Sequence, residues 1–396
     1  MSSASVRSSV RLPAPPPELA ALSAQLCTTL VKAIERDGPM PFSSFMRSAL
    51  YEPGLGYYVN GLHKFGEAGD FITAPEIGTL FAEALAGSLT PLANELGPDW
   101  TLLELGPGSG ALAAALLPAL PRPPARYLLL EPSAMLREVQ HERLSQLPAE
   151  LVGRIEWIDA PPEQPFDGVI VANEIIDALP VERFRVVAPI TETVPRRLAV
   201  DWVNDRFTWT DIDPDPRLAT AIDALQARLP APLAPDYESE LCVDLPDWMK
   251  TVTAPLARGL ALFIDYGYPA AEYYHPERNA GTLVCHYRHR AHFDPFVWPG
   301  LTDLSAFVDF SAAARAGQDA GLDLAGFTTQ AGFVLESGVG DRLAVLENDR
   351  ERMQLATELK RLVLPGEMGE KFKLLALTRD IPQPPFFNGF DQSGRL

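Results

Sequence analysis

A glycine-rich turn between an apolar run and a stretch rich in alanine and leucine constrains this fold more than any other feature. Residues 101–105 read Thr-Leu-Leu-Glu-Leu, which is typical of a buried strand, and Gly106, Gly108 and Gly110 follow at once. Residues 111–120 then have the composition of a helix. Glycines let the backbone approach a ligand closely, and a helix start offers free N–H groups. The turn therefore predicts a nucleotide-type ligand held between a strand and a helix.

Three kinds of nucleotide site use such a turn. A P-loop requires a lysine directly after its last glycine, and Ala111 follows Gly110, which excludes a P-loop. A dinucleotide site uses the spacing G-x-G-x-x-G, which this sequence only approximates. A methyltransferase site places an acid two residues before G-x-G-x-G, and Glu104 satisfies that spacing. The turn favours the methyltransferase site and leaves the dinucleotide site as the alternative.

Acidic residues follow the next two predicted strands, over residues 127–130 and 155–158. Glu131 comes directly after the first of them, where a carboxylate can accept both hydroxyls of a ribose. Asp159 follows the second strand and is placed to accept a hydrogen bond from an adenine amino group, with a solvated loop acid as the alternative. Both acids predict an adenosine ligand, and NAD uses the same ribose contact.

A fourth predicted strand, over residues 168–172, is followed by Asn173, Glu174 and Asp177. In an open α/β sheet the reacting groups lie beyond the carboxyl ends of the strands. We expect Glu174 and Asp177 to be catalytic or to contact the substrate, and Asn173 to contact the cofactor. Helix capping is the alternative role for these acids.

The order of predicted elements divides the chain into five segments. Alternating strands and helices are typical of a parallel α/β sheet, and strands that alternate in polarity interrupt this order. We also expect helices over 75–93 and 304–320 and a strand over 327–333. The predicted segments are a disordered tail (1–17), a helical region that covers the cofactor (18–95), the first half of the core (96–183), an antiparallel insertion (184–250) and the second half of the core (251–396), which contains a substrate-side loop (266–303).

The composition excludes several classes of protein. With 33 Lys and Arg against 52 Asp and Glu among 396 residues, the net charge is −19, which disfavours binding to nucleic acid or to an anionic membrane. No apolar run approaches the roughly 20 residues that a membrane-spanning helix needs. The 3 cysteines are far apart in the sequence, so we expect reduced thiols, a cytoplasmic protein and no metal site. The first 17 residues hold five serines, two arginines and no acid, as a transit peptide can, but so few arginines and a Pro-Ala-Pro-Pro-Pro ending favour a disordered tail.

One segment leaves a metal open as an alternative. His286, His289 and His292 lie near Cys285 and Asp294, and a zinc ion takes such ligands. Methyl transfer needs no metal, so we expect this segment to be a loop that covers the substrate or the cofactor, or a solvated surface loop.

Five motifs in order make the chain resemble the MidA family of S-adenosylmethionine-dependent methyltransferases. The resemblance covers roughly residues 20 to 380 and implies a class I methyltransferase fold. This is an α/β fold with a Rossmann-like sheet, an N-terminal helical region and an inserted antiparallel segment. The first four motifs are Gly69-Asp-Phe-Ile-Thr-Ala-Pro-Glu76, Leu105-Gly-Pro-Gly-Ser-Gly110, Asn173-Glu-Ile-Ile-Asp-Ala-Leu-Pro180 and Asp265-Tyr-Gly-Tyr-Pro269. The fifth is the stretch over residues 287–310, which holds Tyr287-Arg-His-Arg290, Asp294-Pro295, Pro299-Gly300, Asp303-Leu304 and Val308-Asp-Phe310.

The resemblance also implies ligands and roles. S-adenosyl-L-methionine is the implied cofactor, and the three glycines of the turn and Glu131 fall on the family's cofactor positions. Residues 69–76 fall on its N-terminal cofactor-side motif. There we expect Gly69 and Pro75 to shape the turn and Thr73 or Glu76 to meet the ligand, with a helix cap as the alternative.

The family includes a mitochondrial complex I assembly factor that symmetrically dimethylates an arginine of a complex I subunit. The resemblance therefore implies a protein-arginine acceptor and makes a complex I subunit a candidate partner. Glu174 and Asp177 are three apart and share a face if the segment is helical, so they are our candidates to grip the guanidinium. The alternatives are another methyl acceptor, a non-catalytic assembly factor that binds the cofactor, and an NAD-dependent oxidoreductase.

Overall fold

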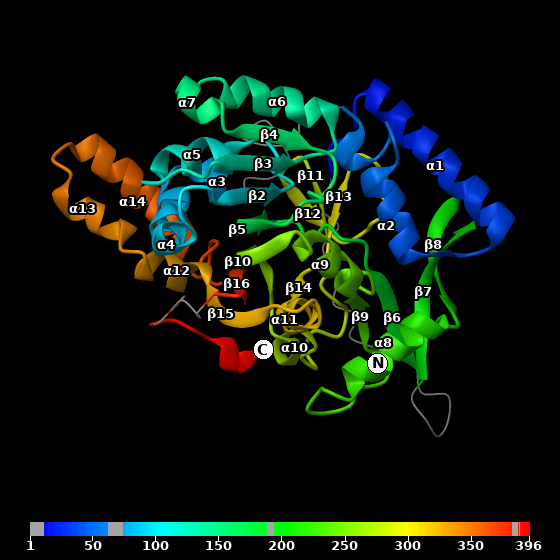
Figure 1. Ribbon diagram of the computed structural model, residues 1–396. Helices are drawn as coiled ribbons and strands as arrows, with labels where there is room; N and C mark the ends of the chain where they lie inside the picture. The colour runs from blue at the N-terminus through cyan, green and yellow to red at the C-terminus, as the bar shows by residue number, and fades with distance from the viewer. Residues whose placement is uncertain (1–11, 62–73, 188–193, 382–386, 388) are drawn as a thin grey trace. The chain divides into compact units, whose positions relative to one another are not determined.

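The structure is a computed structural model, and it forms two compact units that are described separately below (Figure 1). The first unit comprises residues 1–71, 180–243 and 276–306, and the second comprises residues 72–179, 244–275 and 307–396. The predicted tail falls largely outside the described residues, and the five-segment division remains a prediction. The described residues are 12–61, 74–187, 194–381, 387 and 389–396.

The second unit is built on a largely parallel sheet. Its strand order is β15-β16-β10-β5-β2-β3-β4, and β14 pairs with β10. Strands β4, β3, β2, β5 and β10 pair in parallel, whereas β16 is antiparallel to both of its neighbours. The strands are β2 (Thr101–Leu105), β3 (Arg126–Leu130), β4 (Ile155–Ile158), β5 (Phe166–Asn173), β10 (Leu256–Tyr268), β14 (Val308–Asp309), β15 (Asp323–Thr329) and β16 (Phe372–Arg379).

The strand order reverses between β2 and β5, which makes this point the topological switch of the sheet. From β2 the chain proceeds outward to β3 and β4, and from β5 it proceeds in the other direction to β10. Ligands of open α/β sheets bind beyond the carboxyl ends of the strands at such a point. The predicted α/β sheet is confirmed, and its topology directs attention to the residues that follow Leu105 and Asn173.

Helices cover both faces of this sheet, which explains why its central strands are apolar throughout. On one face, Leu102, Val171 and Leu262 share a core with α4, α5, α12 and α14. On the other face, the Trp248 ring of α9 lies 6.1 Å from the ring of Phe263. The helices are α3 (Ala74–Ile77), α4 (Leu80–Leu96), α5 (Ala111–Ala119), α6 (Ala134–Leu144), α7 (Ala149–Val152), α9 (Leu245–Thr253), α10 (Ala270–Tyr273), α11 (Phe310–Asp319), α12 (Gln330–Glu336), α13 (Arg342–Val345) and α14 (Asp349–Val363), with short 3-10 turns at Val339–Asp341 and Ser393–Arg395.

The first unit combines helices with two antiparallel sheets. One sheet has the order β1-β7-β6-β9 with β8 paired to β7, and the other has the order β12-β11-β13. Leu26, Phe45, Val200 and Cys285 belong to its hydrophobic core. The elements are α1 (Pro17–Asp37), β1 (Met40–Pro41), α2 (Phe42–Tyr51), a 3-10 turn (Tyr57–Val59), β6 (Glu182–Val187), β7 (Val194–Val203), β8 (Arg206–Ile212), α8 (Pro216–Gln226), β9 (Glu238–Leu241), β11 (Val284–Tyr287), β12 (Arg290–His292) and β13 (Asp303–Ser305).

Two predicted elements differ from the structure near the end of the chain. The helix expected over 304–320 begins only at Phe310, because residues 303–305 and 308–309 pair as short strands with β11 and β10. The strand expected over 327–333 ends at Thr329, whose hydroxyl accepts the N–H of Gly332 at 3.0 Å and so caps α12. In both places a side-chain cap starts a helix where the local apolar pattern gives no signal.

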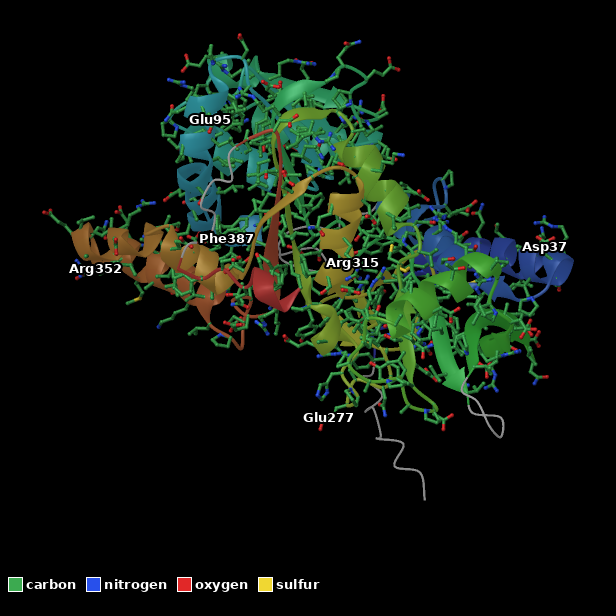
Figure 2. The ribbon with its side chains drawn as sticks, turned by 60° about the horizontal axis from the view of Figure 1, so that its bottom comes forward. Asp37, Glu95, Glu277, Arg315, Arg352 and Phe387 are labelled. Atoms are coloured by element: carbon green, nitrogen blue, oxygen red, sulfur yellow. The ribbon has the colours of Figure 1, made fainter. Side chains whose placement is uncertain are left out.

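Charged side chains lie on the outer surfaces of the helices. Asp37 at the end of α1, Glu95 near the end of α4 and Arg352 on α14 are all exposed (Figure 2). Within the described residues, no helix combines the length and the apolar composition that crossing a membrane requires.

Candidate active site

The glycine turn after β2 adopts a backbone that favours glycine at each of its three positions. The φ angles of Gly106, Gly108 and Gly110 are 56°, 55° and 78°, in the left-handed region that other residues rarely enter. Gly106 N–H donates to Leu130 O at 3.1 Å, and Gly110 N–H donates to Pro107 O at 2.8 Å. These bonds close the turn against β3 and lead directly into α5. The turn is therefore a fixed backbone loop at the switch point of the sheet.

Glu131 lies buried at the end of β3 and is connected to the glycine turn. Its Oε1 accepts the N–H of Ser133 at 2.8 Å, and its Oε2 accepts a longer bond from Gln140 Nε2 at 3.4 Å. The same Gln140 nitrogen donates to Gly108 O at 2.8 Å, and Gln140 Oε1 accepts from Trp157 Nε1 at 2.9 Å. Gln140 is fully buried, so its amide links the predicted ribose acceptor to the turn.

The sequence analysis did not identify Gln140, although a signal for it exists. Leu136, Gln140 and Leu144 are the buried residues of α6 and follow one another at intervals of four. An amide on an otherwise apolar helix face costs free energy unless its hydrogen bonds are made inside the protein. Such an interruption of an apolar stripe indicates a buried polar network.

Asp159 is paired at the surface near the same strands. Its carboxylate lies 2.5 Å from Arg137 Nη2, and its side chain is 80% exposed. Arg137 Nε also donates to Glu131 O at 2.6 Å. The expected contact of Asp159 with an adenine amino group stays a prediction.

Glu104 lies inside the sheet rather than at its edge. Its carboxyl group is buried and accepts the hydroxyl hydrogen of Tyr127 at 2.8 Å. Burial raises the pKa of Glu104 to about 7, because the charged form loses its hydration, and the Tyr127 hydrogen bond opposes this only partly. The acid that precedes the glycine turn is thus poised to gain or lose a proton near neutral pH.

Glu76, on α3, contacts the glycine turn through a serine. Ser109 Oγ donates to Glu76 Oε1, and the two terminal nitrogens of Arg143 lie 3.2 and 3.3 Å from the two Glu76 oxygens. Pro75 is buried beside it, whereas Gly69 and Thr73 lie outside the described residues. The structure thus brings Glu76 to the turn, together with Ser109 and Arg143, which the sequence analysis did not identify.

The end of β5 has an unusual backbone. Glu174 has a φ of 56°, and its N–H donates to Ile264 O at 2.8 Å. A residue other than glycine in this region carries a conformational cost of about 1–3 kcal/mol, and such residues cluster at functional sites. The buried Oδ1 of Asn173, directly before it, accepts no hydrogen bond from the described part of the chain. A buried acceptor of this kind is expected to meet a ligand or water.

The segment after Asn173 is a turn and not a helix, so Glu174 and Asp177 do not share a helix face. Asp177 is buried, and its Oδ2 accepts the hydroxyl of Tyr266 at 2.5 Å. Glu174 is only half-buried. The two acids therefore differ in environment, and Glu174 is the more accessible of them.

Asp265, on β10 beside the end of β5, holds this turn in place. Its Oδ2 accepts the backbone N–H groups of Ile176 at 2.9 Å and of Asp177 at 3.2 Å. Burial raises the pKa of Asp265 well above its usual range, and the negative charges of Asp177 and Glu174 raise it further. The sequence analysis named Asp265 only as the start of a family motif and gave it no role; its position on the strand next to β5 is the signal that could have assigned one. Three carboxyl groups therefore meet where two parallel strands end.

The histidines His286, His289 and His292 do not form a metal site in the described structure. Among the residues that it covers, no group of three or more His, Cys, Asp and Glu side chains is placed to hold a metal ion. Desolvation lowers the pKa of the buried His292.

Comparison with known proteins decides the family. Residues 82–328 match the sequence model of a family described as "Putative S-adenosyl-L-methionine-dependent methyltransferase". The chain belongs to this family. It is also 30% identical to the mitochondrial protein arginine methyltransferase NDUFAF7 of Mus musculus over 391 residues, which covers 88% of this chain and 83% of the relative. The Homo sapiens protein of the same name is 29% identical, with 88% and 82% covered.

A solved structure agrees with this membership. The crystal structure of a Burkholderia thailandensis protein bound to S-adenosyl-homocysteine is 38% identical to this chain, with a TM-score of 0.89. The similarity covers 98% of this chain and all of that one. The protein is an S-adenosylmethionine-dependent methyltransferase. The predicted family, the class I methyltransferase fold and S-adenosylmethionine as the cofactor are confirmed.

One prediction from the composition is wrong. The three scattered cysteines led us to expect reduced thiols and a cytoplasmic protein, whereas the curated relatives are named as mitochondrial proteins. The number and spacing of cysteines indicate whether disulfides form, but they do not specify the compartment in which a protein works.

Proposed function

We propose that this methyltransferase modifies an arginine side chain of a partner protein. The proposal depends on one observation: the carboxyl groups of Glu174, Asp177 and Asp265 lie close together where β5 ends beside β10. A guanidinium is a permanent cation that carboxylates bind in a fork. The names of the relatives, which are protein arginine methyltransferases, support the same acceptor.

The cofactor side fits S-adenosylmethionine. The left-handed glycines Gly106, Gly108 and Gly110 allow a ligand to approach the backbone, and Glu131 offers a buried carboxylate for the ribose hydroxyls. We assign the buried Oδ1 of Asn173 to an N–H donor of the cofactor, since no described residue donates to it.

We keep the other predicted cofactor residues as parts of the proposed site. Glu104 supports the strand that leads into the glycine turn, Asp159 faces the adenosine side, and Glu76, with Pro75 beside it, supports the glycine turn through Ser109. Gly69 and Thr73 complete the N-terminal motif.

When bound, S-adenosylmethionine supplies a methyl group on a sulfonium centre. In the transfer, the bond from sulfur to the methyl carbon breaks as a bond from a guanidinium nitrogen to that carbon forms. A proton then leaves the nitrogen, and S-adenosylhomocysteine is released. The half-buried Glu174 binds the guanidinium and draws its positive charge to one side, which leaves another nitrogen able to attack. Asp177 adds negative charge behind it, and Asp265 accepts the backbone N–H groups of Ile176 and Asp177.

The variant Glu174→Gln tests this assignment, because it keeps the shape of the side chain and removes its charge. We expect binding of S-adenosylhomocysteine to survive and methyl transfer into a lysate of cells lacking the protein to fall about 100- to 1,000-fold. Glu163→Gln, an exposed acid in the same unit, is the matched control and should leave transfer unchanged. Unaltered turnover in Glu174→Gln would remove Glu174 from the reaction, whereas cofactor binding without any transfer by the wild type would indicate a non-catalytic protein.

Mass spectrometry of the labelled product tests the acceptor. We expect the methyl groups on arginine, as symmetric dimethylarginine, and a subunit of respiratory complex I is the first acceptor to examine. A methyl group on lysine or on a small molecule would overturn the arginine proposal and leave the methyltransferase assignment intact, because the fold does not determine the substrate.

A further inference from the structure

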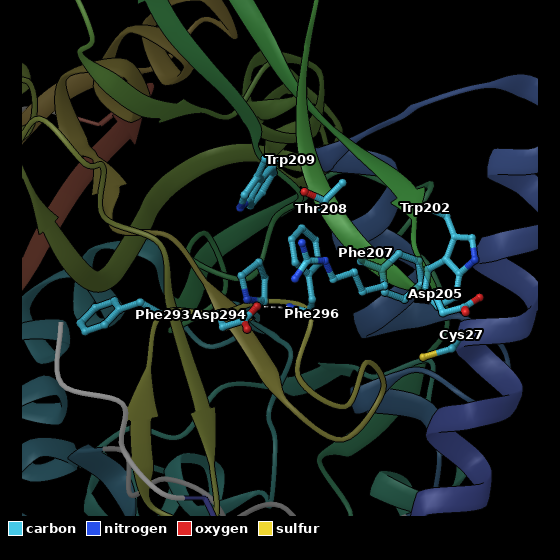
Figure 3. Close-up of a pocket in the computed structure, with 11 residues that line it drawn as sticks. Cys27, Trp202, Asp205, Phe207, Thr208, Trp209, Phe293, Asp294 and Phe296 are labelled. Carbon is cyan, nitrogen blue, oxygen red and sulfur yellow. Dashed lines mark hydrogen bonds between the residues drawn. The ribbon is translucent and has the colours of Figure 1, made fainter. Parts of the chain in front are cut away.

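The first unit contains an open cavity of about 670 Å³ whose lining combines aromatic and polar side chains (Figure 3). A volume of this size suits a small ligand or one large side chain with its flanking backbone. The lining comes from the β7–β8 hairpin and from the segment after β12. Its aromatic members are Trp202, Phe207, Trp209, Phe293 and Phe296.

The inner rings of this cavity are fixed by the core of the unit. The ring of Phe296 lies 5.0 Å from the ring of Trp209 and 6.0 Å from that of Phe207. Phe45 of α2 packs edge-on against both phenylalanines, at 5.5 and 5.6 Å. At the rim of the cavity, Phe293 is 53% exposed. The aromatic wall is therefore formed before any ligand arrives, and Phe293 can adjust to one.

Two carboxylates and one guanidinium share the lining, which gives it a net negative charge. Asp205 follows Asn204 in a two-residue hairpin turn, where both residues have positive φ angles of 58° and 52°, and Arg206 comes next. Asp294 Oδ1 accepts the N–H of Phe296 at 3.0 Å. A carboxylate can accept several hydrogen bonds, so this turn contact leaves Asp294 able to bind a cation. Phosphates and other anions are disfavoured here.

The same unit already shows how such a wall holds a cation. The guanidinium carbon of Arg183 lies 4.8 Å from the centroid of the Trp209 ring, and Arg183 Nε lies 3.0 Å from Glu240 Oε1. Arg183 thus stacks on an aromatic ring and pairs with a carboxylate. A planar guanidinium makes both contacts better than a lysine ammonium does. The cavity offers the same two kinds of partner on its open side.

We propose that this cavity binds the arginine side chain of a peptide segment from a partner protein, with the guanidinium against the aromatic wall and paired to Asp294, while Asp205 adds negative charge on the opposite side of the lining. The site belongs to the first unit alone, and none of its residues is among those proposed for methyl transfer. It therefore provides affinity for an arginine-bearing protein independently of the reaction itself.

Fluorescence anisotropy with a labelled pentapeptide, Gly-Gly-Arg-Gly-Gly, tests the proposal on the full chain. The matched probe carries citrulline, which keeps the shape of arginine and removes its charge. We expect the arginine peptide to bind at least tenfold more tightly than the citrulline peptide, with an affinity that falls as salt rises. Equal binding of the two peptides, or no binding of the arginine peptide at millimolar concentration, overturns the proposal.

Variants assign the binding to this cavity. We expect Asp205→Asn combined with Asp294→Asn, and separately Phe293→Ala, to weaken arginine-peptide binding about fivefold to 30-fold. All three residues are exposed, so the fold should survive, and a native melting curve checks this. Asp213→Asn, an 86% exposed acid just beyond the other end of β8, is the charge-matched control and should bind as the wild type does.

Glu174→Gln separates this site from the proposed reaction. If the cavity holds the peptide, Glu174→Gln retains most of the binding and loses methyl transfer. If Glu174→Gln loses binding of the arginine peptide while the cavity variants bind it normally, the cavity proposal is wrong and the peptide occupies the reaction site. Retained transfer in Glu174→Gln together with lost binding in the cavity variants would instead overturn the catalytic assignment alone.

Discussion

The buried carboxyl group of Glu104 makes the stability of the second unit depend on pH in a direction opposite to that of most acids. Burial raises its pKa in the folded protein to about 7 from an ordinary value of 4.5. The protonated form is therefore favoured by folding. This contribution is fully present below about pH 4.5 and is lost as the pH rises through about 7.

The size of the effect follows from the shift in pKa. Each pKa unit corresponds to about 1.4 kcal/mol, so a shift of roughly two to three units amounts to about 3 kcal/mol. Glu104→Gln keeps an uncharged group that can still accept the Tyr127 hydrogen bond at all pH values. We expect the variant to match the wild type near pH 5 and to be more stable by up to about 3 kcal/mol at pH 8. For a unit of about 230 residues this corresponds to roughly 6–12 °C in Tm.

Thermal unfolding of the ligand-free protein, followed by circular dichroism between pH 5 and pH 8, measures this difference. Subtracting the wild-type Tm at each pH removes the contributions of all other titrating groups. Glu156→Gln is the control, because Arg126 lowers the pKa of this more exposed acid, and its loss should leave Tm equal or lower at pH 8. A Tm difference for Glu104→Gln that stays constant from pH 5 to pH 8 would show that Glu104 does not titrate in the folded protein, and the reasoning would fail.

Two further predictions concern the site. Glu131→Ala removes an acceptor of two ribose hydroxyls and should cost about 2–4 kcal/mol, or roughly 30- to 1,000-fold in affinity for S-adenosylhomocysteine by calorimetry. Wild-type affinity would mean that another residue holds the ribose. Asp265→Asn replaces one acceptor oxygen by an amide nitrogen, so one of its backbone contacts at Ile176, Asp177 or Tyr266 is lost. We expect kcat to fall about tenfold with cofactor affinity unchanged, and an equal loss in both would indicate a general defect of folding.

The sequence alone determined the central strands and the turn between them. The predicted strands over 101–105 and 155–158 have the same bounds as β2 and β4, and the glycines lie in the left-handed turn that their pattern indicates. A parallel strand covered by helices on both faces must be apolar along its length, so it leaves a continuous local signal. A left-handed backbone likewise requires glycine at the positions themselves. Both signals are local because their physical causes are local.

Only the tertiary structure decided which polar groups meet. Asp265 and Ile176 are 89 residues apart, and Glu76 and Arg143 are 67 apart, yet they are hydrogen-bonded. Their contacts depend on which strands and helices become neighbours, and a single sequence carries no periodic pattern for that choice. The same holds for the short strands at 303–309, since a strand of two or three residues exists only where a partner strand offers its free N–H and C=O groups. The candidate acids were predictable as residues at strand ends, whereas their burial and their hydrogen bonds come from the packing around them.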